Sequence, residues 1–193
     1  MKRVIKKNLI VTALLFATLI SNANDGNIIV KDKITNLTYD YVKEGSILSI
    51  KDTNGLILYK ETIKKNGAYA KGFDLTSLPD GNYVFEMDEE VEISIIPFEV
   101  TNNEVSFKKE KQTIINKPII IDKNMKIFLS KLSLKEQPMK VEIYYENGDK
   151  VLSEVLDKRQ SLSRIYDFRS SVKGEYKIVL DTEGRQFIEY VKI

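Results

Sequence analysis

Two stretches decide the fold of this chain: FDLTSLPDGNYVFEM at residues 73–87 and YDFRSSVKGEYKIVL at residues 166–180. Both begin with an apolar-Asp-apolar triplet and continue, at the same spacing, through Ser to Gly-x-Tyr. After the Gly, large apolar residues recur at every second position, as in Tyr83, Phe85 and Met87. This period of two predicts a strand with one buried face. Each stretch therefore predicts a turn followed by a core strand.

The likeness extends outward from these stretches to residues 28–100 and 121–193. The two segments align without a gap at an offset of 93, and 15 of their 73 positions are identical. Because turn residues and core residues keep their spacing, we interpret the likeness as an internal repeat.

Two kinds of repeated turn signal stand inside these segments. Asn54-Gly55 recurs as Asn147-Gly148, and an Asn-Gly pair between apolar runs predicts a hairpin with a type I′ turn, which needs a positive φ at both positions. Gly81 recurs as Gly174, whereas the nearby Pro79 does not recur. The Gly is therefore predicted to be the sterically required residue of its turn.

Short runs rich in Val, Ile, Tyr, Phe and Thr, separated by turn residues, are typical of a β-sandwich or barrel. The sequence predicts an all-β protein of two tandem immunoglobulin-like β-sandwich domains related by the repeat at offset 93. The predicted organisation is a signal peptide, a first domain, a connecting hairpin arm or linker and a second domain, at residues 1–23, 24–103, 104–120 and 121–193.

The first 23 residues read as a cleaved secretory signal. Four basic residues precede an apolar run from Leu9 to Ile20, and Ser21-Asn22-Ala23 has the small residues of a cleavage site. A helix over that run would span about 18 Å, short of the roughly 30 Å hydrocarbon core of a membrane. We expect a mature chain without a transmembrane segment that is secreted, periplasmic or held at the cell surface.

Composition excludes several kinds of chemistry. The chain has no Cys, no His and no Trp, so a disulfide, a Cys/His zinc site and a Ser-His-Asp triad are impossible. Without the signal, the chain carries 26 basic and 28 acidic residues, and no basic stripe indicates nucleic-acid binding. We expect no enzymatic activity, no cofactor, no bound metal and no nucleic-acid partner.

Acidic residues offer two alternatives to that expectation. The densest acidic cluster permits a calcium site or, more simply, a solvated hairpin turn; its members are Glu86, Asp88, Glu89, Glu90 and Glu92. The repeated acids Asp74 and Asp167 could perform hydrolysis only if they converged, and they occupy equivalent places in separate modules. We predict that each accepts hydrogen bonds from the turn that follows it.

Tyrosines are the candidate binding residues. Exposed rings can stack on sugars, although strand aromatics are more often core residues. Tyr144, Tyr145 and Tyr59 are the predicted surface-binding residues, and the adjacent pair Tyr144-Tyr145 must point to opposite faces of its strand. The remaining repeated residues are predicted to be structural: Asn54, Gly55, Asp74, Gly81, Tyr83, Asn147, Gly148, Asp167, Gly174 and Tyr176. Tyr83 and Tyr176 are expected in the core with the hydroxyl on a backbone group, as in a tyrosine corner.

Each copy resembles the C-terminal β-sandwich sorting domains of proteins exported by the type IX secretion system, and related small exported bacterial proteins. The resemblance is carried by Asn147-Gly148, Tyr166-Asp167-Phe168-Arg169-Ser170, Gly174-Glu175-Tyr176 and Val191-Lys192-Ile193. It covers about 73 residues of each copy and implies an immunoglobulin-like fold in the envelope or outside the cell. The first copy departs from the pattern, because Phe98-Glu99-Val100 has no Lys.

These observations favour an exported, non-enzymatic protein that acts in protein interaction, adhesion or envelope assembly through its surfaces and edge strands. A carbohydrate-binding or surface-attachment module that uses exposed Tyr residues is the alternative, and a hydrolase that uses carboxylates is a third reading. The expected partner is a protein or a glycan of unknown identity.

Overall fold

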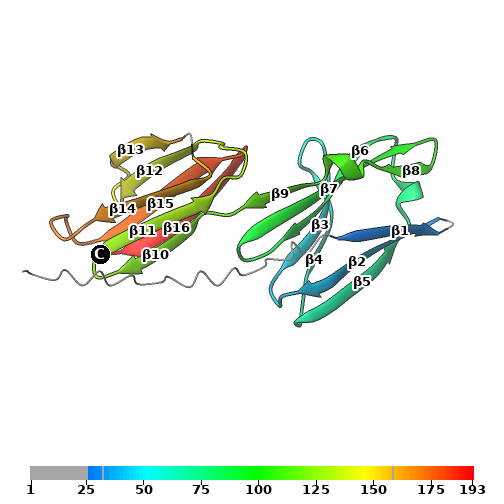
Figure 1. The fold of residues 1–193 in the computed structure, drawn as a ribbon, viewed down its shortest axis with the longest axis horizontal. Helices are drawn as coiled ribbons and strands as arrows, with labels where there is room; N and C mark the ends of the chain where they lie inside the picture. Colours follow the sequence, from blue (N-terminus) through cyan, green and yellow to red (C-terminus); the bar gives the residue numbers. More distant parts are fainter. Residues whose placement is uncertain (1–25, 32, 158) are drawn as a thin grey trace, which may run out of the picture.

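The structure is a computed structural model that describes residues 26–31, 33–157 and 159–193 (Figure 1). The predicted signal peptide lies outside the described residues. The described part is all-β: its strands are joined by turns and by two short 3₁₀ segments, and it contains no α-helix. No helix in this part is long and apolar enough to cross a membrane.

Residues 26–116 form a first unit of two packed sheets. A three-stranded sheet has the order β1-β2-β5, and a larger sheet has the order β4-β3-β6-β7-β8, with β9 also paired to β7. The strands of this unit are β1 (Asn27–Lys31), β2 (Ile34–Val42), β3 (Ile47–Asp52), β4 (Ile57–Thr62), β5 (Gly67–Phe73), β6 (Gly81–Asp88), β7 (Glu92–Thr101), β8 (Glu104–Phe107) and β9 (Thr113–Asn116).

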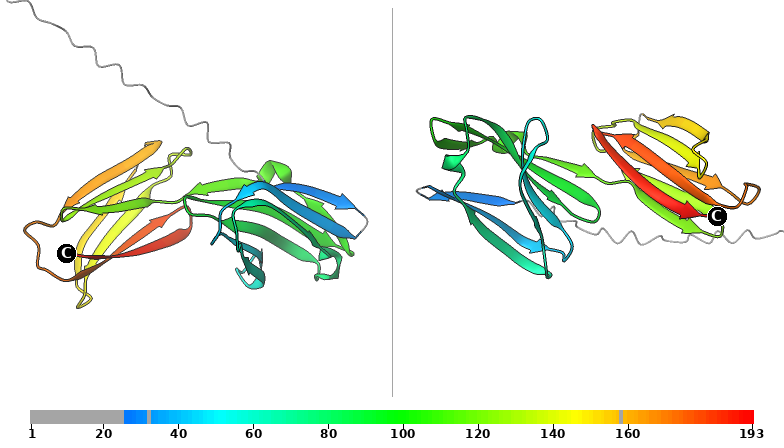
Figure 2. Two further views of the ribbon diagram at one scale, coloured as in Figure 1. Left: turned by 90° about the horizontal axis from the view of Figure 1, so that it is seen from below. Right: turned by 180° about the vertical axis from the view of Figure 1, so that it is seen from behind.

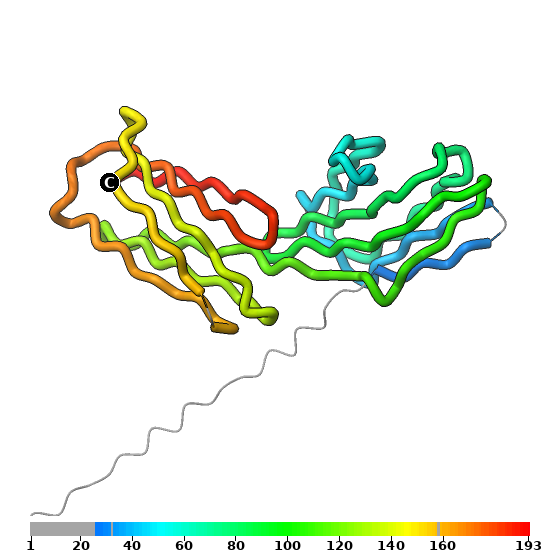
Figure 3. The backbone as a smooth tube through the Cα atoms, turned by 90° about the horizontal axis from the view of Figure 1, so that it is seen from above, coloured from blue at the N-terminus to red at the C-terminus, as the bar shows by residue number. Residues whose placement is uncertain are grey.

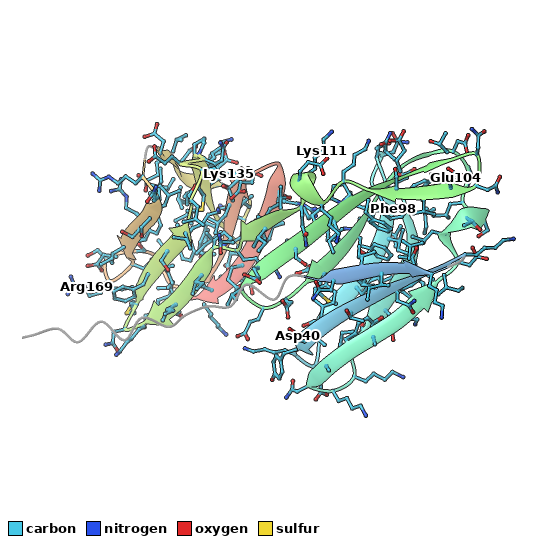
Figure 4. All side chains as sticks on the ribbon, turned by 45° about the vertical axis from the view of Figure 1, so that its right-hand side comes forward. Asp40, Phe98, Glu104, Lys111, Lys135 and Arg169 are labelled. Carbon is cyan, nitrogen blue, oxygen red and sulfur yellow. The ribbon has the colours of Figure 1, made fainter. Side chains whose placement is uncertain are left out.

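Alternating apolar residues of both sheets meet in one core. Leu37 of β2, Phe85 of β6 and Phe98 of β7 are completely or almost completely buried there. Phe85 and Phe98 lie with their ring centroids 5.2 Å apart, and the side chain of Phe98 lies inside the first unit in Figure 4. This shared core makes the unit a β-sandwich.

Residues 119–193 form a second unit with its own two sheets, of order β10-β11-β14 and β13-β12-β15-β16. Its separate core includes Ile127, Ile143, Ile178 and Leu180. The strands are β10 (Ile119–Lys123), β11 (Lys126–Leu132), β12 (Met139–Tyr145), β13 (Lys150–Leu156), β14 (Ser161–Asp167), β15 (Glu175–Thr182) and β16 (Arg185–Lys192).

The two units share strand order and most of their register. Ile47 pairs with Asp88 in the first unit, and the residues 93 later, Lys140 and Asp181, pair with each other in the second. Even the bulge after Ile50 recurs after Ile143. The fourth strand of each unit joins the third, so each sandwich is three strands against four or more, whereas a constant-type immunoglobulin domain has that strand in the other sheet. Descent of both units from one ancestor stays a prediction.

The offset is not constant along the chain. Buried Leu37 of β2 would match Ser130 at an offset of 93, yet the buried residue at that place in β11 is Leu129. An offset of 92 therefore describes the first two strands of each unit. A slip of one residue would turn every side chain of the strand to the other face, so burial decides the register.

The Asn-Gly turns differ from the prediction. Gly55 and Gly148 have φ of +84° and +90°, but Asn54 and Asn147 are not at positive φ. The N–H of each Gly donates to the carbonyl three residues earlier, at 3.1 Å and 2.8 Å. The predicted type I′ turn is therefore wrong, and only the Gly needs the left-handed region, as in three-residue hairpin loops.

The two repeated turn glycines also differ from each other. Gly174 has a φ of +154°, and a Cβ there would lie 2.7 Å from the ring of Tyr145. Gly81 does not have a positive φ, and the nearest atom to its Cβ, the hydroxyl oxygen of Tyr83, would be 3.5 Å away. The predicted steric requirement therefore holds at Gly174 and is wrong at Gly81.

Other structural predictions are confirmed. The Tyr83 hydroxyl donates to the carbonyl of Pro79 at 2.7 Å, and the Tyr176 hydroxyl donates to the carbonyl of Val172 at 2.8 Å. Asp74 accepts from the N–H of Thr76 at 3.1 Å. Asp167 likewise accepts from the N–H of Arg169 at 3.1 Å. All four repeated residues thus fix the loop before β6 or β15.

The predicted connecting arm is part of the first sandwich. β8 pairs with Phe98–Thr101 and β9 with Glu92–Ile95, so both lie along the edge of β7. Val105 and Phe107 of β8 pack against the first core. The predicted start of the second domain, at residue 121, falls inside β10, which pairs with β11. At the junction, the turn between β15 and β16 lies against the first unit (Figures 2 and 3).

Candidate binding surface on the second unit

Tyr145 does not form a surface site. Its ring lies 5.2 Å from that of Tyr176 and packs against the second core. Its hydroxyl donates to the carbonyl of Lys173 at 3.1 Å and to Glu146 Oε1 at 3.2 Å. Burial raises the pKa of Tyr145. This residue closes the end of the sandwich, above Gly174.

Tyr59 lies in the seam between the two sheets of the first unit. Its ring meets Phe73 edge-on at 5.3 Å, and its hydroxyl donates to Glu61 Oε2 at 2.5 Å. Lys71 Nζ approaches both the Tyr59 hydroxyl and Glu61, and its distance to Glu61 Oε2 is 2.7 Å. The pKa of Tyr59 is raised, first by burial and then by the hydrogen bond to Glu61. Tyr59 therefore fills a gap in the sandwich and does not form a stacking platform.

Tyr144 points the other way, onto the outer face of the four-stranded sheet. It is half-buried, and Lys177 on the neighbouring strand places its Nζ 4.9 Å from the ring centroid. Lys150 Nζ lies 5.7 Å from the same centroid. The Tyr144 hydroxyl donates to Glu142 Oε2 at 3.0 Å. Hydrogen bonds from Lys150, Lys140 and Tyr144 lower the pKa of Glu142 to about 2.

Ile188 and Tyr190 of β16 extend this face, and the sequence analysis predicted neither of them as a binding residue. Lys177 pairs with Tyr144 on one side and with Tyr190 of β16 on the other, and Val179 pairs with Ile188. Tyr190 is 59% exposed and Ile188 is 48% exposed. We call Tyr144, Lys177, Val179, Ile188 and Tyr190 the aromatic face. The alternation along residues 185–193 predicts their common side, but only the register brings Tyr190 into line with Tyr144.

The corresponding face of the first unit has different chemistry. The positions of Val179 and Tyr144 are held there by Glu86 and Lys51, whose Nζ lies 2.5 Å from Glu86 Oε1. Arg185, from the start of β16, reaches the same carboxylate with both terminal nitrogens. We call Arg185, Glu86 and Lys51 the clasp. Burial alone raises the pKa of Glu86, but the hydrogen bonds from Arg185 and Lys51 outweigh it and hold the pKa below its usual value.

A buried ion pair positions the clasp. The side chain of Lys131 is fully buried. Its Nζ lies 2.6 Å from Oε1 of Glu183, a residue of the turn between β15 and β16. Glu183 itself has a φ of +50°. Because an unpaired buried ammonium group is costly, this pair fixes the turn that carries Arg185 toward the first unit.

The sheet edges beside the two faces also differ. In the first unit β8 and β9 cover the edge of β7. In the part of the chain that the structure describes, β16 pairs with β15 alone. Exposed Glu189 stands in β16 at the position of fully buried Ile96. A charge turned toward the core side of an edge strand discourages pairing with another strand.

The residues of the predicted acidic cluster do not converge on one point, and several of them pair with different lysines. Asp88 pairs with Lys117, and Glu90 with Lys43 at 2.9 Å. Burial and the nearby Glu92 raise the pKa of Glu89. Among the described residues, no group of three or more His, Cys, Asp or Glu side chains is placed to hold a metal ion.

No protein-family model matches the chain, and no curated protein matches it. Three solved structures illustrate its weak structural likenesses. A biofilm-associated protein BSP domain is 14% identical over 87% of this chain, with a TM-score of 0.29. The human OSCAR ligand-binding domain is 9% identical over 83%, with a TM-score of 0.26. The Group B Streptococcus pullulanase SAP is 12% identical over 85%, with a TM-score of 0.25.

These matches span 29%, 89% and 23% of the respective structures, so the chain corresponds to less than a third of the first and third. Their TM-scores are too low to carry an argument about fold or role. The class of this protein therefore rests on its own sheets and cores, which define an all-β protein built of β-sandwiches.

Proposed function

We propose that the chain is an exported, non-enzymatic binding protein that contacts a protein partner through the aromatic face of its second unit. The observation that supports this proposal is the exposure of Tyr190 and Ile188 beside Tyr144 on one continuous sheet. Aromatic side chains supply a large contact area for a small loss of conformational entropy. Energetically important interface residues are often Tyr, surrounded by less important polar contacts.

The surroundings of the aromatic face favour a partner with acidic groups at its rim. Lys150 and Lys177 flank Tyr144, and Lys192 ends the strand that carries Tyr190. Two carboxylates offset part of this charge: Glu142 accepts hydrogen bonds from Tyr144 and Lys150 and pairs with Lys140, and Glu175 stands opposite Lys192. Such a rim would speed association with an acidic surface and make it salt-dependent.

The flat face suits this role better than the edge of β16. An added strand would have to place a side chain opposite Glu189, where an apolar residue is unfavourable. A partner that binds the aromatic face does not have to place a side chain opposite Glu189, because Ile188 and Tyr190 already point into solvent. The absence of His and Cys from the sequence is consistent with a binding role. The signal-like residues 1–23 support export.

Site-specific photocrosslinking tests the proposal. A benzophenone amino acid replaces Tyr190 in one protein and Tyr41, an exposed tyrosine of the first unit, in a matched control. Illumination in the envelope fraction of the producing cell is expected to yield a discrete protein adduct from position 190 only. Tyr190→Ala should leave the free energy of unfolding within about 0.5 kcal/mol and lower affinity for the captured protein at least tenfold. Equal labelling from both positions would contradict the proposal.

Glycan binding is the second candidate, because Tyr144 and Tyr190 lie in one cross-strand row with a lysine between them. Two rings in a row suit consecutive sugars, and Lys177 could orient a hydroxyl group. Sedimentation with insoluble polysaccharides separates the candidates. A glycan-binding face requires that Tyr144→Ala and Tyr190→Ala each release the protein from the polysaccharide, while Tyr190→Phe retains it.

A further inference from the structure

A pocket opens into the second unit along the seam between β13 and β14. Its volume is about 490 Å³, within the range of small-molecule sites. It lies toward the end of the unit that points away from the first, where Arg169 is found in Figure 4. Its apolar lining includes Leu152, Ile165, Phe168, Val172 and Tyr176.

The pocket runs from solvent into the core. Phe168 and Tyr176 at its base are 5% and 4% exposed and belong to the second core. Val172 and Ile165 at its mouth are among the exposed large apolar residues of the chain. A cavity lined this way keeps apolar surface in contact with water until an apolar ligand covers it.

The first unit shows what occupies the same place when the seam is closed. Tyr59 stands at the position of Leu152, and its ring packs edge-on against Phe73, which in turn lies 5.2 Å from Phe85. Leucine lacks the phenol ring, so the second unit has space where the first has an aromatic side chain. The pocket therefore has the position of a missing tyrosine ring.

The surrounding scaffold is the same in both units. Glu61 and Lys71 link the sheets across the first seam, and Glu154 and Arg164 link them across the second, with a separation of 3.0 Å between Arg164 Nε and Glu154 Oε1. The Tyr166 hydroxyl donates to Glu154 Oε1 at 2.7 Å, which holds this wall of the pocket in place. The site is consequently preformed, and a ligand need not order it.

We propose that this pocket binds a phenol: a neutral aromatic ring with a hydroxyl group, supplied as a small molecule. The apolar walls accept the ring, and the hydroxyl finds acceptors in the side chains of Ser170 and Ser171, which line the same pocket. A charged ligand is disfavoured, because its desolvation would be uncompensated: the carboxylate of Asp167 is already paired with Arg169. This inference is independent of the aromatic face.

Protein-observed NMR with p-cresol, which has the size of a tyrosine side chain, tests the proposal on the two-unit chain, residues 24–193. We expect shifts of the amide signals of Leu152, Phe168 and Val172 that saturate with ligand. Leu152→Tyr copies the first unit and should weaken binding at least tenfold. Toluene, which lacks the hydroxyl, should bind more weakly than p-cresol.

A second variant keeps the test decisive if Leu152→Tyr fails to fold. Tyr59→Leu should open the equivalent seam and add a second set of p-cresol shifts around Phe73, without changing the first set. Absence of saturable shifts at Leu152 in the unmodified chain would overturn the proposal, as would p-cresol binding that a folded Leu152→Tyr variant retains. N-acetyltyrosinamide, added in a parallel titration, distinguishes the source: tighter binding than p-cresol would overturn the small-molecule assignment in favour of a tyrosine from a polypeptide.

Discussion

The first and second units have the same strand order, but they differ at the edge of one sheet and at the seam between the two sheets. In the first, β8 and β9 cover the edge of β7, and Tyr59 fills the seam between the sheets. In the second, a pocket occupies that seam, and the aromatic face is exposed. Core and turn residues therefore set the framework, whereas a few side chains outside that framework decide which surfaces remain available for binding.

The largest expected effect tests whether the two cores are independent. Phe85 is fully buried against Phe73, Phe98 and Phe107, so Phe85→Ala should cost the first unit about 3–5 kcal/mol. Urea denaturation followed by NMR signals from each unit should show only the first unit shifted to lower urea concentration. Ile178→Ala in the second unit is the reciprocal control. Simultaneous loss of both sets of signals would show one cooperative core.

The turn glycines give the next effect. Gly174→Ala should destabilise the second unit by about 1–3 kcal/mol, because an alanine there meets an unfavourable φ and the ring of Tyr145. Gly81→Ala should change the free energy of unfolding by no more than about 0.5 kcal/mol. Thermal denaturation of the two variants measures both. Equal costs would mean that the two turns have the same conformation.

Removal of the hydroxyl group of Tyr83 or Tyr176 should lower the free energy of unfolding by a smaller amount, which should be equal in the two units. Tyr83→Phe and Tyr176→Phe each remove one hydrogen bond to a carbonyl group and retain the ring. Each should cost about 0.5–1.5 kcal/mol in its own unit. The free energy of unfolding from chemical denaturation is the measurement, and a marked inequality would show that the two hydroxyl contacts are not equivalent.

The smallest effect on the two cores is expected from a change in the clasp. Arg185 is 32% exposed, so Arg185→Ala should loosen the junction by only on the order of 1 kcal/mol and leave both cores folded. Because the pKa of Glu86 is held below its usual value of 4.5, the clasp is fully formed above that pH and weakens as the pH falls through the lowered value. Small-angle scattering should show a wider range of inter-unit distances in the variant at neutral pH and in the parent protein in acid. An unchanged scattering profile in both cases would exclude a role for the clasp.

Much of the fold was predictable because its signals are local. The alternation of Tyr83, Phe85 and Met87 places them on the buried side of β6, and Asp74 lies at the turn that it was expected to stabilise. The turn types were not predictable: Asn54 suggested a type I′ turn, but the hydrogen bond from Gly55 to Asp52 requires another geometry. The turns at Gly81 and Gly174 share a glycine but differ in φ, because the neighbouring side chains differ.

The candidate site was predictable only in part. Tyr144 was expected at the surface, but Tyr145 and Tyr59 were expected there too, and both pack into the sandwich. Tyr190 and Ile188 were missed, because their proximity to Tyr144 depends on strand pairing over long sequence distances. The pocket was also invisible in the sequence, since it depends on the space left by Leu152 between two separate strands.

Local sequence signals specify the all-β class, the positions of most strands and the buried side of each, because turn chemistry and side-chain alternation act between residues close together in the chain. Three features emerge only when the chain folds: residues 104–116 complete the first sandwich, Arg185 reaches Glu86, and the second seam stays open. Those features depend on contacts between distant segments and on the volume of single side chains, which no local pattern encodes.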